Sequence, residues 1–127
     1  MTMQQGTFGW NELMTTDVAK SKAFFTKLIG WTTSDMPMPG GQGTYTLMHS
    51  AGKPVAGMMA MAGEQWKGVP AHWMAYIAVD DVDAPAGKVP ELVGKVCLPP
   101  TDIPGVGRFC VISDPSGATV SLMTFKM

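Results

Sequence analysis

The chain has 127 residues, of which 46% are hydrophobic and 15% charged, and its formal net charge is −1. This length suits one domain with one hydrophobic core, and this composition is typical of a globular protein and not of a disordered one. The near-neutral charge offers no basic surface to nucleic acid or to an anionic membrane, and no apolar run approaches the ~20 residues that span a bilayer. Because the polar start also lacks a signal-peptide pattern, we expect a cytoplasmic protein with neither nucleic acid nor membrane as a partner.

The two halves of the chain keep one register when the sequence is shifted against itself by 64 positions. Internal repeats of this kind indicate two copies of one supersecondary unit. We therefore expect modules at about residues 8–63 and 72–127 within one domain of residues 1–127. The pairs that carry the register are Leu13 with Ile77, Asp17 with Asp81, Leu28 with Leu92, Gly30 with Gly94, Tyr45 with Phe109, and Met59 with Met123.

The first half is predicted to begin with a strand and a helix. Residues Trp10–Thr16 form the expected strand, and Asp17 stands where a helix N-cap belongs, because its carboxylate can accept hydrogen bonds from free backbone N–H groups. Apolar residues at helical spacing between Val18 and Ile29, followed by a stop at Gly30, predict the helix. Further strands are expected at residues 31–34, 44–49 and 55–61.

The second half is predicted to repeat this order. A strand at Met74–Asp80 leads to Asp81 as the N-cap of a helix that runs from Val82 towards Val93. This helix carries two prolines, and an interior proline costs about 3 kcal/mol, so we expect it to be shorter than the first or kinked near Pro90. Strands are then expected at residues 95–98, 108–113 and 119–125, which makes both halves βαβββ.

The glycine-rich segments and the cysteines have modest predicted roles. Gly40–Gly43 and the segment IPGVG are expected to be turns at the rim of a pocket and not phosphate loops, because neither leads into a helix. Cys97 and Cys110 are too few for a disulfide scaffold. They could face each other across a hairpin, but we interpret them as two small buried hydrophobic residues.

Three stretches of the sequence resemble the vicinal oxygen chelate superfamily, which includes glyoxalase I, extradiol dioxygenases, fosfomycin-resistance enzymes and bleomycin-resistance proteins. They are LMTTDVAKSKAFFTKLIGW, YIAVDDVDA and TDIPGVGRFCVISDPSGATVSL, and the resemblance covers about residues 8 to 125. It implies an α+β fold in which two tandem βαβββ modules form a curved mixed sheet around a small-molecule cavity. It also implies a homodimer, and leaves open whether the modules close on each other within one chain or across two.

The resemblance also predicts where a metal would be held and why this chain lacks one. Metal-dependent members take their ligands from the first and last strands of each half, and the matching positions here are Trp10, Gly57, Met74 and Ser121. None of these four is a competent ligand for Zn²⁺, Ni²⁺ or Fe²⁺. His49 and His72 are the only histidines, and one of them with Glu12 would make a poor site. We therefore expect neither a metal nor another cofactor.

The same resemblance assigns the inner face of each sheet to the pocket. Side chains alternate along a strand, so Trp10, Glu12 and Met14 are expected to point inward while Leu13 and Thr15 face the helices. The alternative is that methionines fill the cavity and leave no space for a ligand. The predicted ligand-binding residues are Trp10, Met14, Met59, Met74, Tyr76, Ser121 and Met123.

Glu12 is the candidate catalytic residue. A carboxylate on the inner face of a strand costs free energy unless it is paired, and burial would suit it to act as a general base. The structural alternatives are a hydrogen bond to Tyr76 or a salt bridge to a lysine or to Arg108.

From the missing metal ligands and the apolar inner face, we predict metal-independent binding of a small, partly aromatic or apolar molecule. The alternatives are a glyoxalase-like lyase or isomerase, or a hydroxylase-like enzyme, that uses Glu12 as base, and an accessory domain with a filled core.

Overall fold

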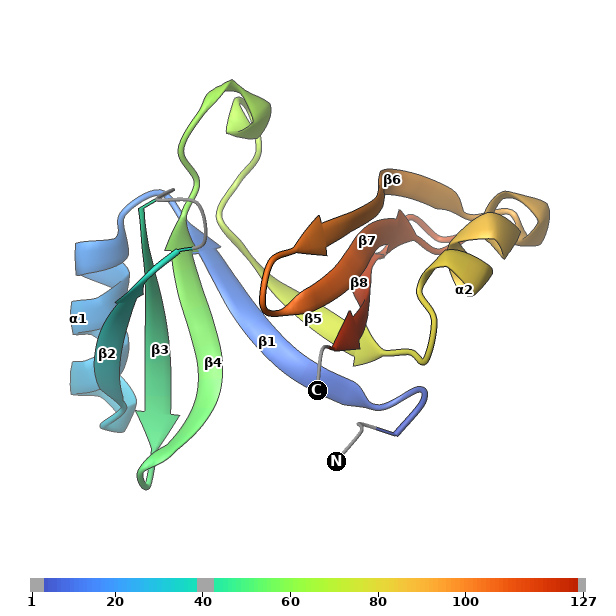
Figure 1. The fold of residues 1–127 in the computed structure, drawn as a ribbon. Coiled ribbons are helices and arrows are strands. Elements are labelled where there is room, and N and C mark those ends of the chain that lie inside the picture. The colour runs from blue at the N-terminus through green and yellow to red at the C-terminus, as the bar shows by residue number, and fades with distance from the viewer. Residues whose placement is uncertain (1–3, 39–42, 126–127) are drawn as a thin grey trace. The chain divides into compact units, whose positions relative to one another are not determined.

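The computed structural model describes residues 4–38 and 43–125, which divide into two units. The first unit is Asn11–Trp73, and the second joins Met1–Trp10 to Met74–Met127. Across the described residues the chain follows the predicted order twice (Figure 1). The elements are β1 (Phe8–Thr15), α1 (Val18–Ile29), β2 (Thr32–Pro37), β3 (Thr44–Ser50), β4 (Lys53–Ala60), the 3₁₀ turn η2 (Glu64–Trp66), β5 (His72–Ala78), α2 (Asp83–Lys88), the 3₁₀ turn η3 (Pro90–Leu92), β6 (Lys95–Ile103), β7 (Gly107–Ser113) and β8 (Thr119–Phe125).

The first unit is a four-stranded mixed sheet in the order β2-β3-β4-β1 with α1 along one face (Figure 1). The pair β1–β4 is parallel and the other pairs are antiparallel. Leu13, Met48 and Met58 form the buried core on the helix side, and Val18 and Phe25 of α1 pack against it. Because side chains alternate along a strand, the neighbours of Leu13 on β1 face the opposite side of the sheet.

Capping residues fix the ends of α1 as the sequence predicts. The Asp17 carboxylate accepts a hydrogen bond from the backbone N–H of Lys20 at 3.0 Å. Gly30 ends the helix in the left-handed conformation, with φ at 78°, and its N–H donates to the carbonyl of Thr26. Only glycine adopts this conformation without strain, so the position of Gly30 decides where α1 stops.

The second unit has the corresponding order β5-β8-β7-β6, with β5–β8 parallel and the rest antiparallel. Its buried core consists of Val79, Val82, Ala86, Cys110 and Leu122. Burial raises the pKa of the Cys110 thiol, as expected for a cysteine that packs as a small apolar side chain. The predicted α+β fold of two βαβββ modules with mixed strand pairing is thereby confirmed.

The second helix is shortened, as the prolines predict. α2 ends at Lys88, and Pro90 starts the separate turn η3. The predicted N-cap at Asp81 is wrong by one residue, because Val82 is the N-cap and offers no side-chain hydrogen bond. Asp81 still accepts a hydrogen bond from the backbone N–H of Asp83 at 3.1 Å, so it stabilises the start of α2 from one position earlier.

The hairpin of β6 and β7 differs from the prediction. β6 continues to Ile103, beyond the predicted end at Leu98, and the IPGVG segment forms the turn, in which the Val106 N–H donates to the Ile103 carbonyl at 2.9 Å. The interpretation of both cysteines as buried is wrong for Cys97, which is exposed. Of the Gly40–Gly43 segment, residues 40–42 lie outside the described residues. Among the helices of the described residues, none has the length and apolar character to cross a membrane.

Candidate functional site

A hydrogen bond joins Glu12 to Tyr45 across the sheet of the first unit, beside Gly57. Glu12 lies on β1 with 7% of its surface exposed, directly opposite Gly57 of β4. The Tyr45 hydroxyl on β3 donates a hydrogen bond to Oε2 of Glu12 at 2.6 Å. A Cβ atom at Gly57 would overlap the Tyr45 phenol. The glycine therefore lets the tyrosine ring lie across β4 and reach the carboxylate on β1.

This contact explains how a carboxylate is tolerated on a buried strand. Removing an ionised carboxylate from water is costly unless hydrogen bonds replace those to solvent, and a short bond from a phenol to a carboxylate is one of the stronger kinds. The sequence interpretation offered Tyr76, a lysine or Arg108 as partners of Glu12 and missed Tyr45. A glycine opposite a buried carboxylate was the signal that could have found it.

The same three positions recur in the second unit at the repeat offset of 64, where Tyr76, Phe109 and Ser121 stand for Glu12, Tyr45 and Gly57. Tyr76 and Ser121 are directly opposite each other on β5 and β8. The rings of Tyr76 and Phe109 lie 6.3 Å apart with an interplanar angle of 48°. In each unit, therefore, aromatic side chains lie beside the parallel strand pair. These are Tyr45 at β1–β4, and Tyr76 with Phe109 at β5–β8.

Ser121 differs from the other buried polar groups. Its side chain is fully buried, and its Oγ has no hydrogen-bond partner among the described residues. A buried polar atom without a partner costs about 1–3 kcal/mol, so native proteins rarely leave one. Met123, two residues further along β8, lies opposite Phe109 and Ala78. Ser121 is thus a hydrogen-bonding group within largely apolar surroundings.

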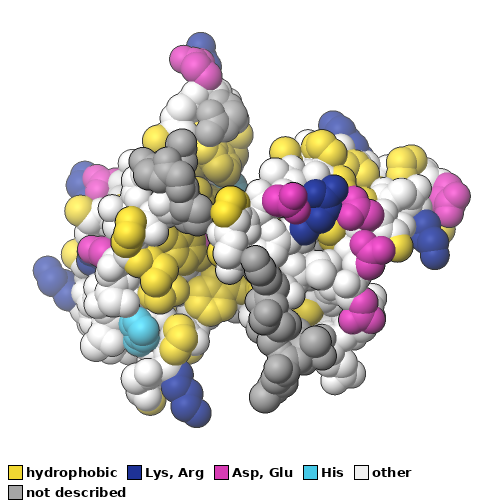
Figure 2. All heavy atoms as spheres, viewed as in Figure 1, with side chains coloured by type: hydrophobic (Ala, Val, Ile, Leu, Met, Phe, Trp, Pro, Cys, Tyr) yellow, Lys and Arg dark blue, Asp and Glu magenta, His cyan; other side chains and the backbone are white. Residues whose placement is uncertain are grey.

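The predicted site residues divide between the two units. Glu12, Met14 and Met59 lie in the first, and the other predicted residues lie in the second. Trp10 and Met59 are partly exposed and the rest are buried. Figure 2 shows hydrophobic side chains gathered over the sheet of the first unit, which agrees with an apolar face. The buried members are Glu12 at 7% exposed, Met14 at 6%, Met74 at 8%, Tyr76 at 5%, Ser121 at 0% and Met123 at 4%.

The residues at the family's metal positions do not fit a metal ion. Trp10, Gly57, Met74 and Ser121 offer no imidazole, carboxylate or thiolate. At position 57 the Tyr45 ring also occupies the space that a ligating side chain would need. In the described ranges, no three His, Cys, Asp or Glu side chains gather closely enough to hold a metal ion.

The two histidines make other contacts. His49 Nε2 lies 3.0 Å from Ser34 Oγ, and His72 Nδ1 lies 2.8 Å from the Pro70 carbonyl. His49 of β3 therefore has a ring nitrogen at hydrogen-bond distance from the neighbouring strand β2, and His72 has one at that distance from the residues just before β5.

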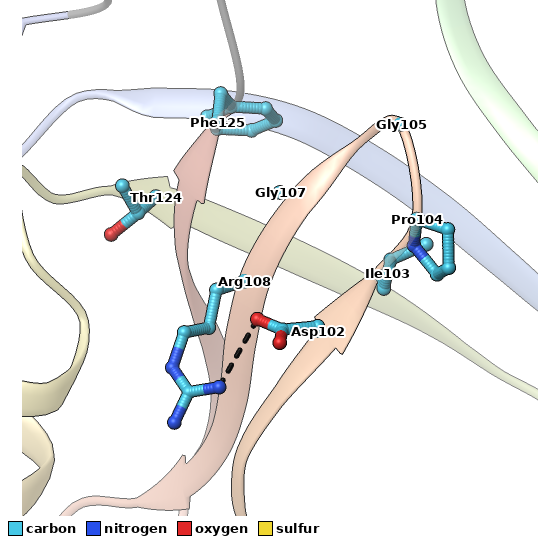
Figure 3. Close-up of a pocket in the computed structure, with 8 residues that line it drawn as sticks. All are labelled: Asp102, Ile103, Pro104, Gly105, Gly107, Arg108, Thr124 and Phe125. Atoms are coloured by element: carbon cyan, nitrogen blue, oxygen red, sulfur yellow. Dashed lines mark hydrogen bonds and ion pairs between the residues drawn. The ribbon is translucent and has the colours of Figure 1, made fainter.

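A separate pocket of about 330 Å³ lies at the β6–β7 hairpin of the second unit (Figure 3). Arg108 reaches it and donates to Asp102 at 3.1 Å and to both carboxylate oxygens of Asp83 at 2.9 and 3.0 Å. The hydrogen bonds and charge of Arg108 hold the pKa of the Asp83 carboxyl below its ordinary value. Because the arginine is already paired twice, its role is to tie α2 to the hairpin. No predicted site residue lines this pocket, which is formed by Asp102, Ile103, Pro104, Gly105, Gly107, Arg108, Thr124 and Phe125.

Comparison with known structures supports the fold. The methylmalonyl-CoA epimerase of Mycobacterium tuberculosis superimposes with a TM-score of 0.66 at 11% sequence identity, over 100% of this chain and 94% of the epimerase. A hypothetical protein from Bacillus halodurans superimposes with a TM-score of 0.69 at 10% identity, over 98% of this chain and 97% of that one. At these identities the likeness extends to the fold alone.

Comparison with curated sequences adds nearer relatives. The protein CFP32 of M. tuberculosis, whose name provisionally assigns it as a glyoxylase, is 44% identical over 119 residues, which are 94% of this chain and 46% of CFP32. The anthracycline biosynthesis protein DnrV of Streptomyces peucetius is 37% identical over 128 residues, covering 92% of this chain and 46% of DnrV. The chain thus spans about half the length of these relatives. The family model described as glyoxalase/bleomycin resistance protein/dioxygenase superfamily matches residues 7–122. The chain belongs to this superfamily.

Proposed function

We propose that the chain binds a small, partly aromatic or apolar molecule without the help of a metal ion. The observation that carries the proposal is the buried Ser121 hydroxyl, which lies beside Tyr76 and has no hydrogen-bond partner within residues 4–38 and 43–125. Ligand sites combine apolar walls with a few polar groups that orient the ligand, and aromatic and methionine side chains suit flat rings. A ligand oxygen or nitrogen at Ser121 would satisfy the hydroxyl.

The relatives favour the same class of ligand. DnrV is named as an anthracycline biosynthesis protein. The family model itself includes bleomycin resistance proteins. Because the chain covers 46% of DnrV, a shared ligand class is part of the proposal and not a property of this chain.

The test is a calorimetric titration with anthraquinone-2-sulfonate, a soluble planar probe with carbonyl oxygens. We expect binding that is unchanged by EDTA and that Ser121→Ala weakens about five- to tenfold, the value of one hydrogen bond. Ser50→Ala, at an exposed serine on β3, is the matched control and should bind as the wild type does. Loss of binding in EDTA, or equal affinity of Ser121→Ala and wild type, would contradict the proposal.

The second candidate function is a glyoxalase-like lyase or isomerase, or a hydroxylase-like enzyme, with Glu12 as general base. The 2.6 Å contact with Tyr45 favours it, since it holds the carboxylate in one orientation. Glu12→Gln should then reduce turnover of the methylglyoxal–glutathione hemithioacetal by roughly 10²–10⁴-fold, the usual worth of a positioned base, with affinity little changed. Equal turnover in wild type and Glu12→Gln would remove Glu12 from any such mechanism.

We further propose that the chain acts in the cytoplasm as a homodimer. The homodimer is supported by the resemblance to the superfamily.

A further inference from the structure

The sheet of the first unit has a second face, which lies away from α1 and which we call the far face. The buried core of the unit lies on the α1 side, and side chains alternate along a strand, so every second residue of each strand belongs to the far face. The strand register aligns these residues across the four strands. They are Ser34 of β2, Tyr45, Leu47 and His49 of β3, Gly57 and Met59 of β4, and Glu12 and Met14 of β1.

The middle of the far face is apolar. Leu47 and Met59 are half-buried, so part of each side chain is accessible, and Met14 lies beside Met59 on the neighbouring strand. Figure 2 shows hydrophobic side chains gathered over this sheet. Leucine and methionine side chains adapt well to a flat ring, so they can hold the apolar part of a ligand.

A serine and a histidine form a polar pair at the margin of this apolar area. Ser34 is opposite Leu47, and its Oγ lies 3.0 Å from Nε2 of His49. Ser34 is exposed and His49 is half-buried, so both are accessible to a ligand. The contact through Nε2 holds the imidazole ring in one orientation. The other ring nitrogen, Nδ1, has no hydrogen-bond partner in the part of the chain that the structure describes.

The chemistry of this pair favours an acidic group when the imidazole is protonated. Both nitrogens of a protonated imidazole are donors, so Nε2 then donates to Ser34 Oγ and Nδ1 has a hydrogen to donate to a ligand. The Ser34 hydroxyl, which accepts from Nε2, has its own hydrogen to donate as well. Two donors beside a positive charge match the oxygens of a carboxylate or a sulfonate, because hydrogen bonds between charged groups are the stronger ones.

The lysines of the first unit do not compete for this role. Three of them lie on α1, which packs on the other face of the sheet. Lys53 is opposite Ser50, the residue that follows His49, so alternation turns its side chain to the α1 side. Lys67 follows η2 and lies outside the sheet. Within residues 11–38 and 43–73, a positive charge on the far face is therefore supplied by His49 alone.

The acidic groups near His49 are already bonded or lie at a distance. Asp35 of β2 is on the α1 side, where it accepts hydrogen bonds from Lys22 and Thr46. Glu12 shares the far face, but β4 separates its strand from β3, which places it about 10 Å away at the usual spacing of strands. Its carboxylate also accepts the short hydrogen bond from Tyr45.

We propose that Ser34 and His49 bind the acidic group of a planar ligand whose apolar part lies on Leu47 and Met59, so that the chain selects organic anions. This inference rests on the function proposed above and names the class of molecule within it. A carboxylate or sulfonate gains the contact with His49, a neutral planar molecule binds through the apolar side chains only, and an amine is repelled by the protonated imidazole. Histidine side chains ordinarily change their charge between about pH 5 and 8, so the selection depends on pH.

The test compares anthraquinone-2-sulfonate with the neutral 2-(hydroxymethyl)anthraquinone by quenching of the fluorescence of the four tryptophans. Lowering the pH from about 8 to about 5.5 should strengthen binding of the sulfonate roughly tenfold, the value of one hydrogen bond between charged groups, and leave binding of the neutral probe unchanged. His49→Gln should abolish this pH dependence, and Ser34→Ala should reduce it. His72→Gln replaces the other histidine of the chain and is the matched control, which should behave as the wild type does.

A second measurement locates the sulfonate in the unaltered protein. Because the chain has two histidines, the His72→Gln variant assigns their imidazole resonances in a proton NMR spectrum. The sulfonate should shift the resonances of His49 and leave those of His72 in place. This readout does not depend on how well His49→Gln folds, which far-UV circular dichroism will verify.

The outcomes separate this inference from the function on which it rests. If neither probe binds at any pH, the proposed function and this inference both fail. If both probes bind and the sulfonate shows no pH dependence, or shows the same dependence in His49→Gln, planar binding stands and the role of His49 is refuted. An equal gain of the neutral probe at low pH, or a sulfonate that shifts the resonances of His72 and not those of His49, also refutes it.

Discussion

Gly57→Ala should destabilise the protein far more than the added methyl group suggests. The backbone of Gly57 is not in the left-handed region, so alanine is conformationally acceptable there. Its Cβ would overlap Oη, Cζ and Cε2 of Tyr45, and the ring has to leave its place over β4. The hydrogen bond to Glu12 is lost when the ring moves, which leaves a buried carboxylate without that donor.

The expected cost follows from these two changes. Loss of a hydrogen bond to a charged group is worth about 1.5–3 kcal/mol, and overpacking adds about 1–3 kcal/mol. Replacing glycine by alanine also reduces the conformational entropy of the unfolded chain, which offsets about 0.5–1 kcal/mol of this loss in the free energy of unfolding. We therefore expect Gly57→Ala to lower the free energy of unfolding by about 2–5 kcal/mol. The control is Gly87→Ala in α2, where a Cβ meets nothing within 4 Å and where we expect no loss.

Urea denaturation followed by tryptophan fluorescence measures both variants, and a double-mutant cycle tests the cause. Tyr45→Ala removes the ring, so Gly57→Ala introduced into that background should cost little. The two substitutions should thus be strongly non-additive, and their combined cost should be below the sum of the separate costs. If Gly57→Ala is as mild as Gly87→Ala, or if the cycle is additive, the proposed arrangement of Tyr45 over Gly57 is refuted.

Further predictions concern the caps and turns and use the same denaturation assay. Asp17→Ala should lower the free energy of unfolding by about 1 kcal/mol, because the Lys20 N–H loses its acceptor. Gly30→Ala should also cost about 1 kcal/mol, since φ is 78°. The pKa of Asp114 is held below its ordinary value of 3.8 by hydrogen bonds, first from Ser116. The ionised Asp114 carboxylate therefore stabilises the folded state above pH 3.8, and this stabilisation is lost as the pH falls through the lower pKa of the folded state. The difference in free energy of unfolding between wild type and Asp114→Asn should shrink over the same pH range.

The sequence predicts those parts of the fold that depend on local chemistry. Asp17 and Gly30 mark the ends of α1 because caps act within one turn, and Pro90 predicts the short second helix because its ring prevents continuation. Alternation along β1 places Leu13 in the helix-side core as expected. The predicted strand ends at residue 98, whereas β6 continues through Pro99 and Pro100 to Ile103, because an edge strand tolerates proline.

The site is less predictable because it depends on contacts across strands. Tyr45 and Glu12 are 33 residues apart and lie on strands that β4 separates, so no periodicity connects them. The contact exists only because position 57 carries no side chain. Likewise, the burial of Ser121 depends on the side chains that β5 and β7 place beside it, and so does the lack of a hydrogen-bond partner for its hydroxyl in the part of the chain that the structure describes. The sequence of a single strand does not reveal these neighbours.

The repeat yields one more prediction, which concerns Phe109. In the first unit a phenol at the equivalent position reaches across the neighbouring strand, where Gly57 leaves room for it. Phe109 lacks the hydroxyl, and Ser121 places a short side chain at the position that corresponds to that glycine. Phe109→Tyr should bring a hydroxyl close to Ser121 and raise the free energy of unfolding by about 1 kcal/mol, the net value of one hydrogen bond. In a Ser121→Ala background the same substitution should give no gain. Because the new phenol would compete with a ligand for Ser121, Phe109→Tyr should also bind anthraquinone-2-sulfonate more weakly. A gain in stability that persists in Ser121→Ala would show that the hydroxyl finds another partner and that the two units do not use their equivalent positions alike.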